Sequence, residues 1–195
     1  MKEEVETFKS PPFVAVSTFV SAQTLTNDAF HSRLGFEVAH LMVSNISGHF
    51  SDFKSTVTFT KEDLSDAKFT LTAKVATINT GVEPRDNHLR SADFFDAEKY
   101  PEMKFVSTSV TKEFGNKYKM EGDLTMHGVT KKVSLTVVYN GLVTNPMNKV
   151  KTHGFTVKGS LNRKDFNVGA NFNNAVVGET IQIISNLEFP VEAGK

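Results

Sequence analysis

The most regular pattern in the chain is the alternation KFTLTAKV at positions 68–75. Phe69, Leu71, Ala73 and Val75 share one face, and the other face carries only Lys and Thr. Period-two alternation with β-branched residues is typical of an antiparallel strand with one buried face. Comparable patterns predict seven further strands, at 34–44, 46–60, 103–112, 117–127, 130–143, 152–162 and 179–190.

Eight short strands separated by turns predict an all-β fold, either a sandwich or a barrel. We favour an eight-stranded antiparallel barrel, because closure removes the exposed edges that so many strands would otherwise present. The length of 195 residues fits a single domain of this kind. Residues 1–24 break the pattern, and we treat them as an N-terminal extension that forms either a strand or a short amphipathic helix.

The composition excludes several classes of protein. Lys plus Arg and Asp plus Glu both number 22, and this neutral balance argues against a nucleic-acid partner. The absence of Cys excludes disulfides, thiolate nucleophiles and Cys-based zinc sites. No apolar run is long enough for a membrane span. Acidic residues near Met1 are unlike a signal peptide, so we expect a cytoplasmic protein as the chain stands, or a periplasmic one if the chain is a processed form.

The histidines and the short motifs give no catalytic or metal signature. None of the six His has the spacing of a metalloprotease helix, and the chain has no nucleophile elbow or phosphate-binding loop. His40 shares a stripe with Phe36, Val38 and Met42, which favours a hydrogen-bonded interior or pore-mouth histidine over a metal ligand. We therefore expect neither a metal nor a cofactor.

The connection between the strands at 68–75 and 103–112 is too long for a hairpin. Pro84 suits a first helical turn and Pro101 ends what precedes it, so 84–100 is expected to contain one or two short helical turns.

Two interpretations of this connection remain open. Asp86, His88 and Asp93 are able in principle to form an acid–base group. Alternatively, hydrogen bonds from Arg85, Asp86, Arg90 and Asp93 to one another and to loop carbonyls hold the connection against the barrel. We favour the second interpretation, since a long irregular segment needs partners for its backbone.

Large apolar residues are interrupted by small ones within the same stripe. Gly122 stands between Met120 and Leu124, and Gly159 between Val157 and Leu161. An eight-stranded barrel is just wide enough either to be filled by side chains or to hold one small ligand. The stripes alone leave both possibilities open.

Several motifs together resemble the YceI-like family of lipocalin-like, polyisoprenoid-binding proteins. They are R-D-x-H-L-R-S-x-D-F-F-D at 85–96, K-Y-P at 99–101 and F-x-S at 105–107, with NDAFHSRLGFEVAHL at 27–41, GHF at 48–50, GDLTMHGVTKKV at 122–133 and LNRKDF at 161–166. The resemblance covers about 25–195. The chain departs from it at Asn27, where a branched apolar residue is common.

The resemblance implies an extended eight-stranded antiparallel barrel over 25–195, whose apolar pore binds a long isoprenoid or similar lipid, often as a homodimer. It implies no catalytic residue. The central motif is then a structural loop, with the residues Arg85, Asp86, His88, Leu89, Asp93, Phe94, Phe95, Tyr100 and Pro101.

Side chains alternate between the two faces of each strand, and this alternation identifies the residues that are expected to form the wall of the pore. The expected lipid-binding residues are Phe36, Val38, Phe59, Phe69, Leu71, Phe105, Leu124, Met126, Phe155, Val157, Ile181 and Ile183. Small residues on the same stripes are expected to leave room for the ligand, namely Ala73, Ser107, Gly122 and Gly159. Two rival functions remain: a lipid-modifying enzyme that uses Asp86, His88 and Asp93, and a structural or stress-associated domain with a fully packed core.

Overall fold

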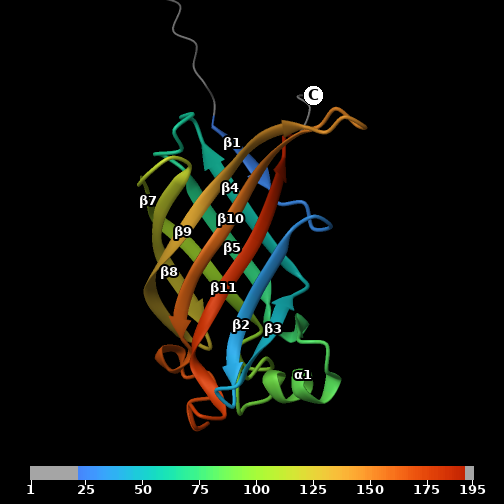
Figure 1. Cartoon of the computed structure of the whole chain (residues 1–195), viewed down its shortest axis with the longest axis vertical. Coiled ribbons are helices and arrows are strands. Elements are labelled where there is room, and N and C mark those ends of the chain that lie inside the picture. Colours follow the sequence, from blue (N-terminus) through green and yellow to red (C-terminus); the bar gives the residue numbers. More distant parts are fainter. Residues whose placement is uncertain (1–21, 192–195) are drawn as a thin grey trace, which may run out of the picture.

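A single curled antiparallel sheet dominates the computed structural model, which describes residues 22–191 (Figure 1). Its eleven strands follow the order β1-β4-β5-β7-β8-β9-β10-β11-β2-β3-β6. The strands are β1 (Gln23–Thr26), β2 (Arg33–His40), β3 (Ser44–Phe50), β4 (Phe53–Phe59), β5 (Lys68–Lys74), β6 (Ile78–Asn79), β7 (Glu102–Lys112), β8 (Lys117–Met126), β9 (Val129–Thr144), β10 (Lys151–Asn162) and β11 (Val177–Pro190).

The predicted all-β, barrel-like fold is confirmed, but the strand count is eleven and not eight. The segment 46–60 is two strands, because the chain bends at Ser51 and Asp52, where both backbone N–H groups donate to Thr77. The bend carries the chain from β3, which pairs with β2, to β4, which pairs with β5. The two-residue strand β6 and the short β1 were too brief for a periodic signal.

Residues just after β1 connect the two sides of the curled sheet. Asn27 N donates to the carbonyl of Ser55 on β4 at 3.0 Å, and Asp28 N donates to the carbonyl of Glu188 on β11 at 2.8 Å. The buried Asn27 side chain also accepts from Ser55 N at 2.6 Å. The side-chain amide of Asn27 therefore helps to hold the end of β1 against β4, and a branched apolar side chain has no oxygen that could accept this hydrogen bond. Most of the segment 1–24 lies outside the described residues.

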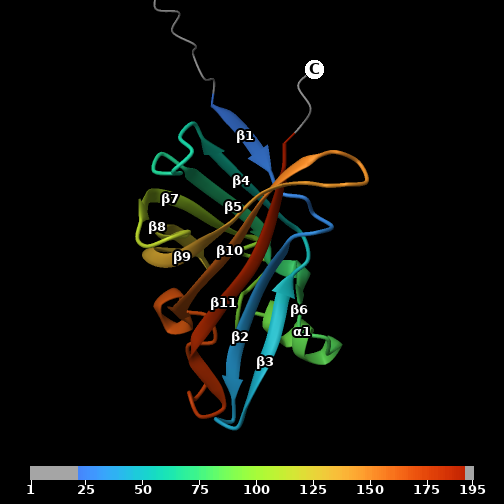
Figure 2. The same cartoon turned by 45° about the horizontal axis from the view of Figure 1, so that its top comes forward.

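The short helix predicted in the long connection is present as α1 (Glu83–Arg90), and Figure 2 shows it beside β6 at one end of the barrel. Pro84 lies in its first turn, where a missing N–H costs no hydrogen bond. Glu83 and Asp86 near its start and Arg90 near its end complement the helix dipole. Two further single turns are η1 (Val75–Thr77) and η2 (Arg163–Phe166).

An aromatic cluster fills the end of the barrel where β1 begins and β11 ends. Phe155 is central to it, with ring centroids 5.4 Å from Phe69, 5.1 Å from Tyr139 and 5.6 Å from Phe189. His153 extends the cluster to Phe59, at 5.2 Å, and its Nδ1 lies 2.9 Å from the hydroxyl of Tyr139. We call these six residues, Phe59, Phe69, Tyr139, His153, Phe155 and Phe189, the aromatic plug.

The small residues in the stripes make room for neighbouring side chains and not for a ligand. A Cβ on Gly122 would lie 2.5 Å from the ring of Phe105 and 2.6 Å from the carbonyl oxygen of Val106. A Cβ on Gly159 would lie 2.4 Å from Leu135. Ala73 is buried, and the hydroxyl of Ser107 accepts from Phe69 N at 2.8 Å. The expectation that Gly122 and Gly159 leave space in the pore was wrong, because the side chains of Phe105 and Leu135 already occupy that space.

Replacing Gly122 therefore tests packing. We expect Gly122→Ala to lower the free energy of unfolding by about 1–3 kcal/mol, since the new methyl group overpacks Phe105 and meets a backbone oxygen. Urea denaturation followed by circular dichroism measures the change. The neighbouring Asp123→Ala is the control and should stay within about 0.5 kcal/mol, because it removes only an exposed ion pair. An unchanged midpoint for Gly122→Ala would contradict the packing described.

Candidate functional site

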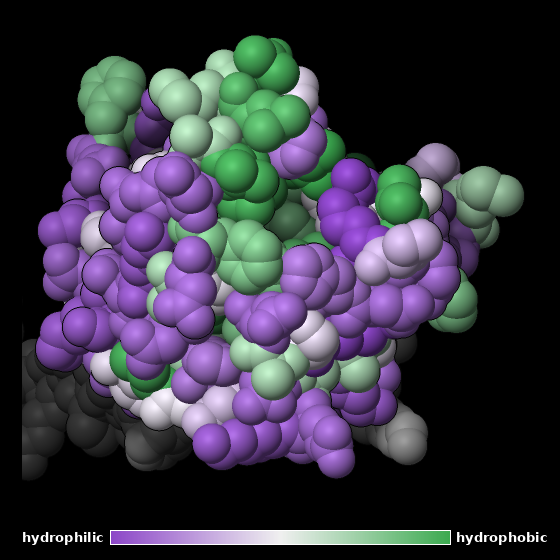
Figure 3. All heavy atoms as spheres, turned by 90° about the horizontal axis from the view of Figure 1, so that it is seen from below, coloured by the Kyte–Doolittle hydropathy of each residue, from purple (hydrophilic) through white to green (hydrophobic). Residues whose placement is uncertain are grey.

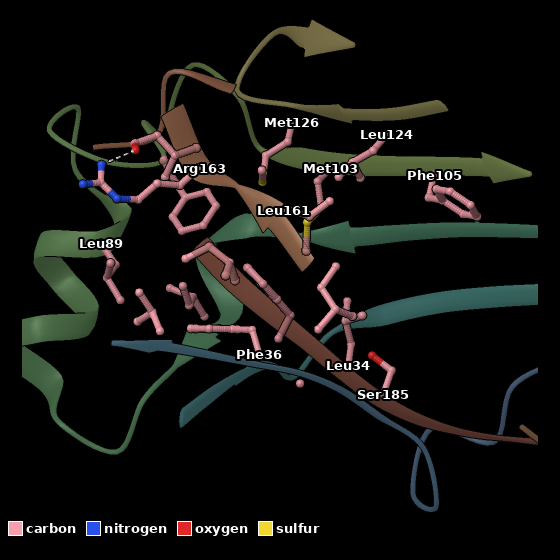
Figure 4. Close-up of a pocket in the computed structure, with 18 of the residues that line it drawn as sticks. Leu34, Phe36, Leu89, Met103, Phe105, Leu124, Met126, Leu161, Arg163 and Ser185 are labelled. Carbon is pink, nitrogen blue, oxygen red and sulfur yellow. Dashed lines mark hydrogen bonds between the residues drawn. The ribbon is translucent and has the colours of Figure 1, made fainter. Parts of the chain in front are cut away.

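A cavity of about 420 Å³ occupies the half of the barrel that the aromatic plug leaves open. Its volume falls within the usual range for small-molecule sites. Apolar side chains from β2, β5, β7, β8, β10 and β11 form most of the wall, and Figure 4 shows several of them around the lumen. Seen from the open end, the surface has a recess that is bordered by apolar residues on one side and by hydrophilic residues on the other (Figure 3). The barrel is thus closed at one end and accessible at the other.

Ten of the twelve predicted wall residues line this cavity. They are Phe36, Val38, Phe69, Leu71, Phe105, Leu124, Met126, Val157, Ile181 and Ile183. Phe59 and Phe155 do not line it, because both face inward at the level of the aromatic plug and pack against other rings. Strand alternation correctly predicted that these two side chains face inward, but it did not predict where they lie along the barrel axis.

Other wall residues escaped the sequence analysis. Some continue a stripe that was already identified, and the same parity signal was available for them: Leu34, Met103, Met120, Leu161 and Leu187. Others come from the two long connections, 84–100 and 163–178, where side-chain direction follows no period: Leu89, Phe94, Phe95, Val168, Phe172 and Val176. Both connections therefore contribute to the site.

Thr80 and Asp86 fasten the start of α1 to the barrel. Asp86 is buried, and its carboxylate accepts hydrogen bonds from the backbone N–H and the hydroxyl of Thr80. Arg85 donates to the same threonine, from Nε to Oγ1 at 2.7 Å and from Nη2 to the carbonyl at 2.9 Å. Asp86 is thus a structural acceptor, whose partner is Thr80 and not one of the arginines.

The suggested acid–base group does not assemble. Asp86 and His88 are two residues apart on α1, a spacing that points side chains in different directions. Asp86 turns inward to Thr80, whereas His88 Nε2 lies 3.1 Å from Asp93 Oδ2 in a pair that is about half exposed. Among the described residues, no three His, Asp or Glu side chains group to hold a metal ion.

Aromatic contacts join the two long connections over the cavity. The ring of Phe94 stacks on Phe172 at 4.5 Å, and His88 packs edge-on against Phe94 at 5.0 Å. Phe95 contacts Phe50 on β3 at 5.9 Å, while Leu89 projects toward the lumen (Figure 4). The motif that begins at Arg85 thereby covers part of the open end.

The last residues of the motif, Tyr100 and Pro101, anchor the connection and do not line the cavity. Tyr100 packs 4.6 Å from the ring of His127 and against Gly128, whose φ of +74° favours glycine. The carbonyl of Pro101 accepts from Val75 N at 2.9 Å. These contacts lead the chain into β7.

Arg163 organises the second connection, 163–178. Its buried guanidinium donates to five carbonyls, those of Val168, Gly169, Phe172, Val177 and Gly178. Burial lowers the pKa of the Arg163 side chain, and the carboxylate of Glu179 opposes this shift. Because all five N–H donors of an arginine are committed, none remains for an anionic ligand.

One side of the cavity mouth lacks Asp, Glu, Lys and Arg. Neither 38–51 nor 166–178 contains Asp, Glu, Lys or Arg, although charged residues make up 23% of the chain. The two segments meet where Leu41 N donates to the carbonyl of Val176 at 3.1 Å. Leu41 and Met42 form the tip of the β2–β3 hairpin, so Met42 is exposed and does not continue the His40 stripe inward. An apolar chain that enters beside this tip meets no Asp, Glu, Lys or Arg side chain from these two segments.

The comparison with known families agrees with this geometry. The YceI-like domain matches residues 25–189 of the chain. The chain belongs to the YceI-like family. A UPF0312 protein of Staphylococcus aureus (strain MSSA476) is 38% identical over 168 residues, which cover 86% of this chain and 94% of that protein. A UPF0312 protein of Photorhabdus laumondii is 43% identical over 140 residues, which cover 72% of each chain.

Three solved structures have the same fold. BcnA of Burkholderia cenocepacia superposes with a TM-score of 0.75 at 26% identity, covering 83% of this chain and 98% of its own. The YCEI protein of Campylobacter jejuni gives 0.70 at 28% identity, covering 95% and 100%. A polyisoprenoid binding domain from Saccharophagus degradans gives 0.62 at 14% identity, covering 85% and 97%, which shows a shared fold.

The fastening of α1 generates a prediction about stability. We expect Asp86→Ala to lower the free energy of unfolding by about 1–3 kcal/mol, because the N–H and hydroxyl of Thr80 lose their buried acceptor. Chemical denaturation measures the loss. Asp93→Ala is the matched control within the same motif, and its effect should stay below about 1 kcal/mol because its pair with His88 is exposed. Equal losses in the two variants would contradict the assigned roles.

Proposed function

We propose that this YceI-like protein binds a long-chain apolar lipid in its cavity and carries or sequesters it without chemical change. The observation that carries the proposal is a preformed cavity with an almost wholly apolar wall, closed by the aromatic plug at one end and accessible at the other. Candidate ligands are a polyisoprenoid, an isoprenoid quinone or its precursor, or a fatty acyl derivative. The shared fold with a polyisoprenoid binding domain supports this class.

Hydrophobic transfer alone provides enough free energy for such binding. Each CH₂ removed from water contributes about 0.8 kcal/mol, so a chain with about 15 buried carbons contributes about 12 kcal/mol. Association costs at least about 4 kcal/mol in lost motion. The remaining ~8 kcal/mol corresponds to roughly micromolar affinity, before any polar contact is counted.

The geometry favours a carrier over the two rivals. A lipid-modifying enzyme would need reactive groups that converge on the lumen, and Asp86 faces Thr80 while Asp93 lies at the surface. A structural domain with a packed core would not leave a cavity of this size between its sheet faces. Within residues 22–191 no helix is long and apolar enough to cross a membrane. Assembly as a homodimer remains a prediction.

Two neighbouring isoleucines on β11 give a matched test. Ile183 faces the cavity, whereas Ile184 faces outward and is 39% exposed. We expect Ile183→Trp to weaken polyprenol binding at least about tenfold, because the indole fills space that the ligand needs. Ile184→Trp should bind as the parent protein does. Native mass spectrometry of delipidated protein with added polyprenol measures both, after circular dichroism has shown that each variant folds.

The same spectra separate the alternatives. Equal uptake by the two variants would show that the ligand does not enter the cavity, and no uptake by the parent protein would contradict lipid binding itself. A carrier returns the polyprenol with unchanged mass after prolonged incubation. A product of altered mass, lost in His88→Ala, would instead favour the enzyme.

A further inference from the structure

Ser185 differs from its apolar neighbours in the cavity wall because it carries a buried hydroxyl group. It is buried on β11 with 2% exposure, and its hydroxyl has no hydrogen-bond partner among the described residues. Its cross-strand neighbours are Leu34 on β2 and Val157 on β10, and the next inward residues of its own strand are Ile183 and Leu187. None of these four side chains is able to pair with the hydroxyl.

The hydroxyl faces the inner part of the lumen. Figure 4 shows its oxygen on the cavity side, with Phe105 toward the same end and Arg163 and Leu89 toward the other. A buried hydroxyl without a partner is costly, and such groups in native proteins require an explanation. Ser55, the other serine in the wall, has no such deficit because its hydroxyl donates to the carbonyl of Thr70 at 2.9 Å.

We propose that the Ser185 hydroxyl hydrogen-bonds an uncharged oxygen-bearing group of the ligand, which enters the barrel ahead of its apolar chain. The inference rests on the proposed lipid-binding function and names the chemical class of the ligand. A serine hydroxyl both donates and accepts, so an alcohol, a carbonyl or an amide satisfies it.

The inserted group is uncharged because the inner lumen offers no compensation for charge. The wall residues next to Ser185 on its own strand and opposite it, Leu34, Val157, Ile183 and Leu187, are all apolar, and burying an ionised phosphate there without a cation would be unfavourable. Two arginines line the cavity: Arg163 has every N–H donor bound to a carbonyl, and Arg85, on α1 at the open end, donates to Thr80. A long-chain alcohol is therefore preferred over both its phosphate ester and the corresponding hydrocarbon.

The test compares geranylgeraniol with the hydrocarbon of the same carbon skeleton, using delipidated parent protein, Ser185→Ala and Ser55→Ala. The parent should bind the alcohol about fivefold to tenfold more tightly than the hydrocarbon, as expected for one neutral hydrogen bond. Ser185→Ala should lose this preference while still binding both. Ser55→Ala should keep the preference, whatever its effect on the two affinities, because that hydroxyl already has a partner.

A second readout concerns the ligand-free protein. Ser185→Ala should be at least as stable as the parent toward urea, since it removes an unpaired buried hydroxyl. A clear loss of stability would show that the protein itself satisfies the hydroxyl, and would overturn the inference. So would an alcohol preference that persists in Ser185→Ala, or geranylgeranyl phosphate binding more tightly than the alcohol. If the parent binds neither the alcohol nor the hydrocarbon, the proposed function fails as well.

Discussion

The open end of the barrel depends on the guanidinium of Arg163. Its five N–H donors bind carbonyls in the second connection and in the first two residues of β11, and so replace the water that these backbone groups would otherwise need. A buried arginine with carbonyl partners holds a loop at several points at once, which apolar packing alone cannot do. The loop held in this way places Phe172 against Phe94 and Val176 against the β2–β3 hairpin.

Aromatic residues lie at both ends of the barrel, but they fill the lumen at one end and only cover it at the other. At one end aromatic rings meet one another and fill the lumen, with Phe155 contacting three of them. At the other end the rings of Phe94, Phe95 and Phe172 belong to connections outside the sheet, so they cover the lumen without filling it. The cavity lies where most of the sheet's own inward residues are aliphatic. Its apolar wall makes the cavity a favourable site for hydrocarbon chains, because moving apolar surface out of water is favourable.

Strand alternation predicted much of this architecture. The inward face of β2, β5, β7, β8, β10 and β11 was correctly assigned, because period two is a local property of a strand with one buried face. Phe59 and Phe155 were placed in the pore wrongly, since parity carries no information on height along the barrel. Gly122 was misread for a related reason: the ring that fills its space belongs to Phe105 on the neighbouring strand, and the relative register of two strands is not visible in one sequence.

The connections were less predictable than the strands. The sequence indicated a helical turn after Pro84 but not that Asp86 turns to Thr80, because the partner depends on where β6 ends. The role of Arg163 was also hidden, since its acceptors are backbone carbonyls that leave no side-chain signature. The unpaired hydroxyl of Ser185 likewise emerges only when the residues opposite it on β2 and β10 are known.

The methionines allow the central claim, that a lipid chain occupies the cavity, to be observed directly. Met103, Met120 and Met126 line the cavity, whereas Met147 is exposed on the β9–β10 hairpin at the other end of the barrel. Methyl-labelled methionine therefore reports on both places in one NMR spectrum. On titration of delipidated protein with a polyprenol, the three cavity methyl signals should shift together and saturate, while that of Met147 stays in place. Cavity signals that do not move while Met147 responds would contradict the account.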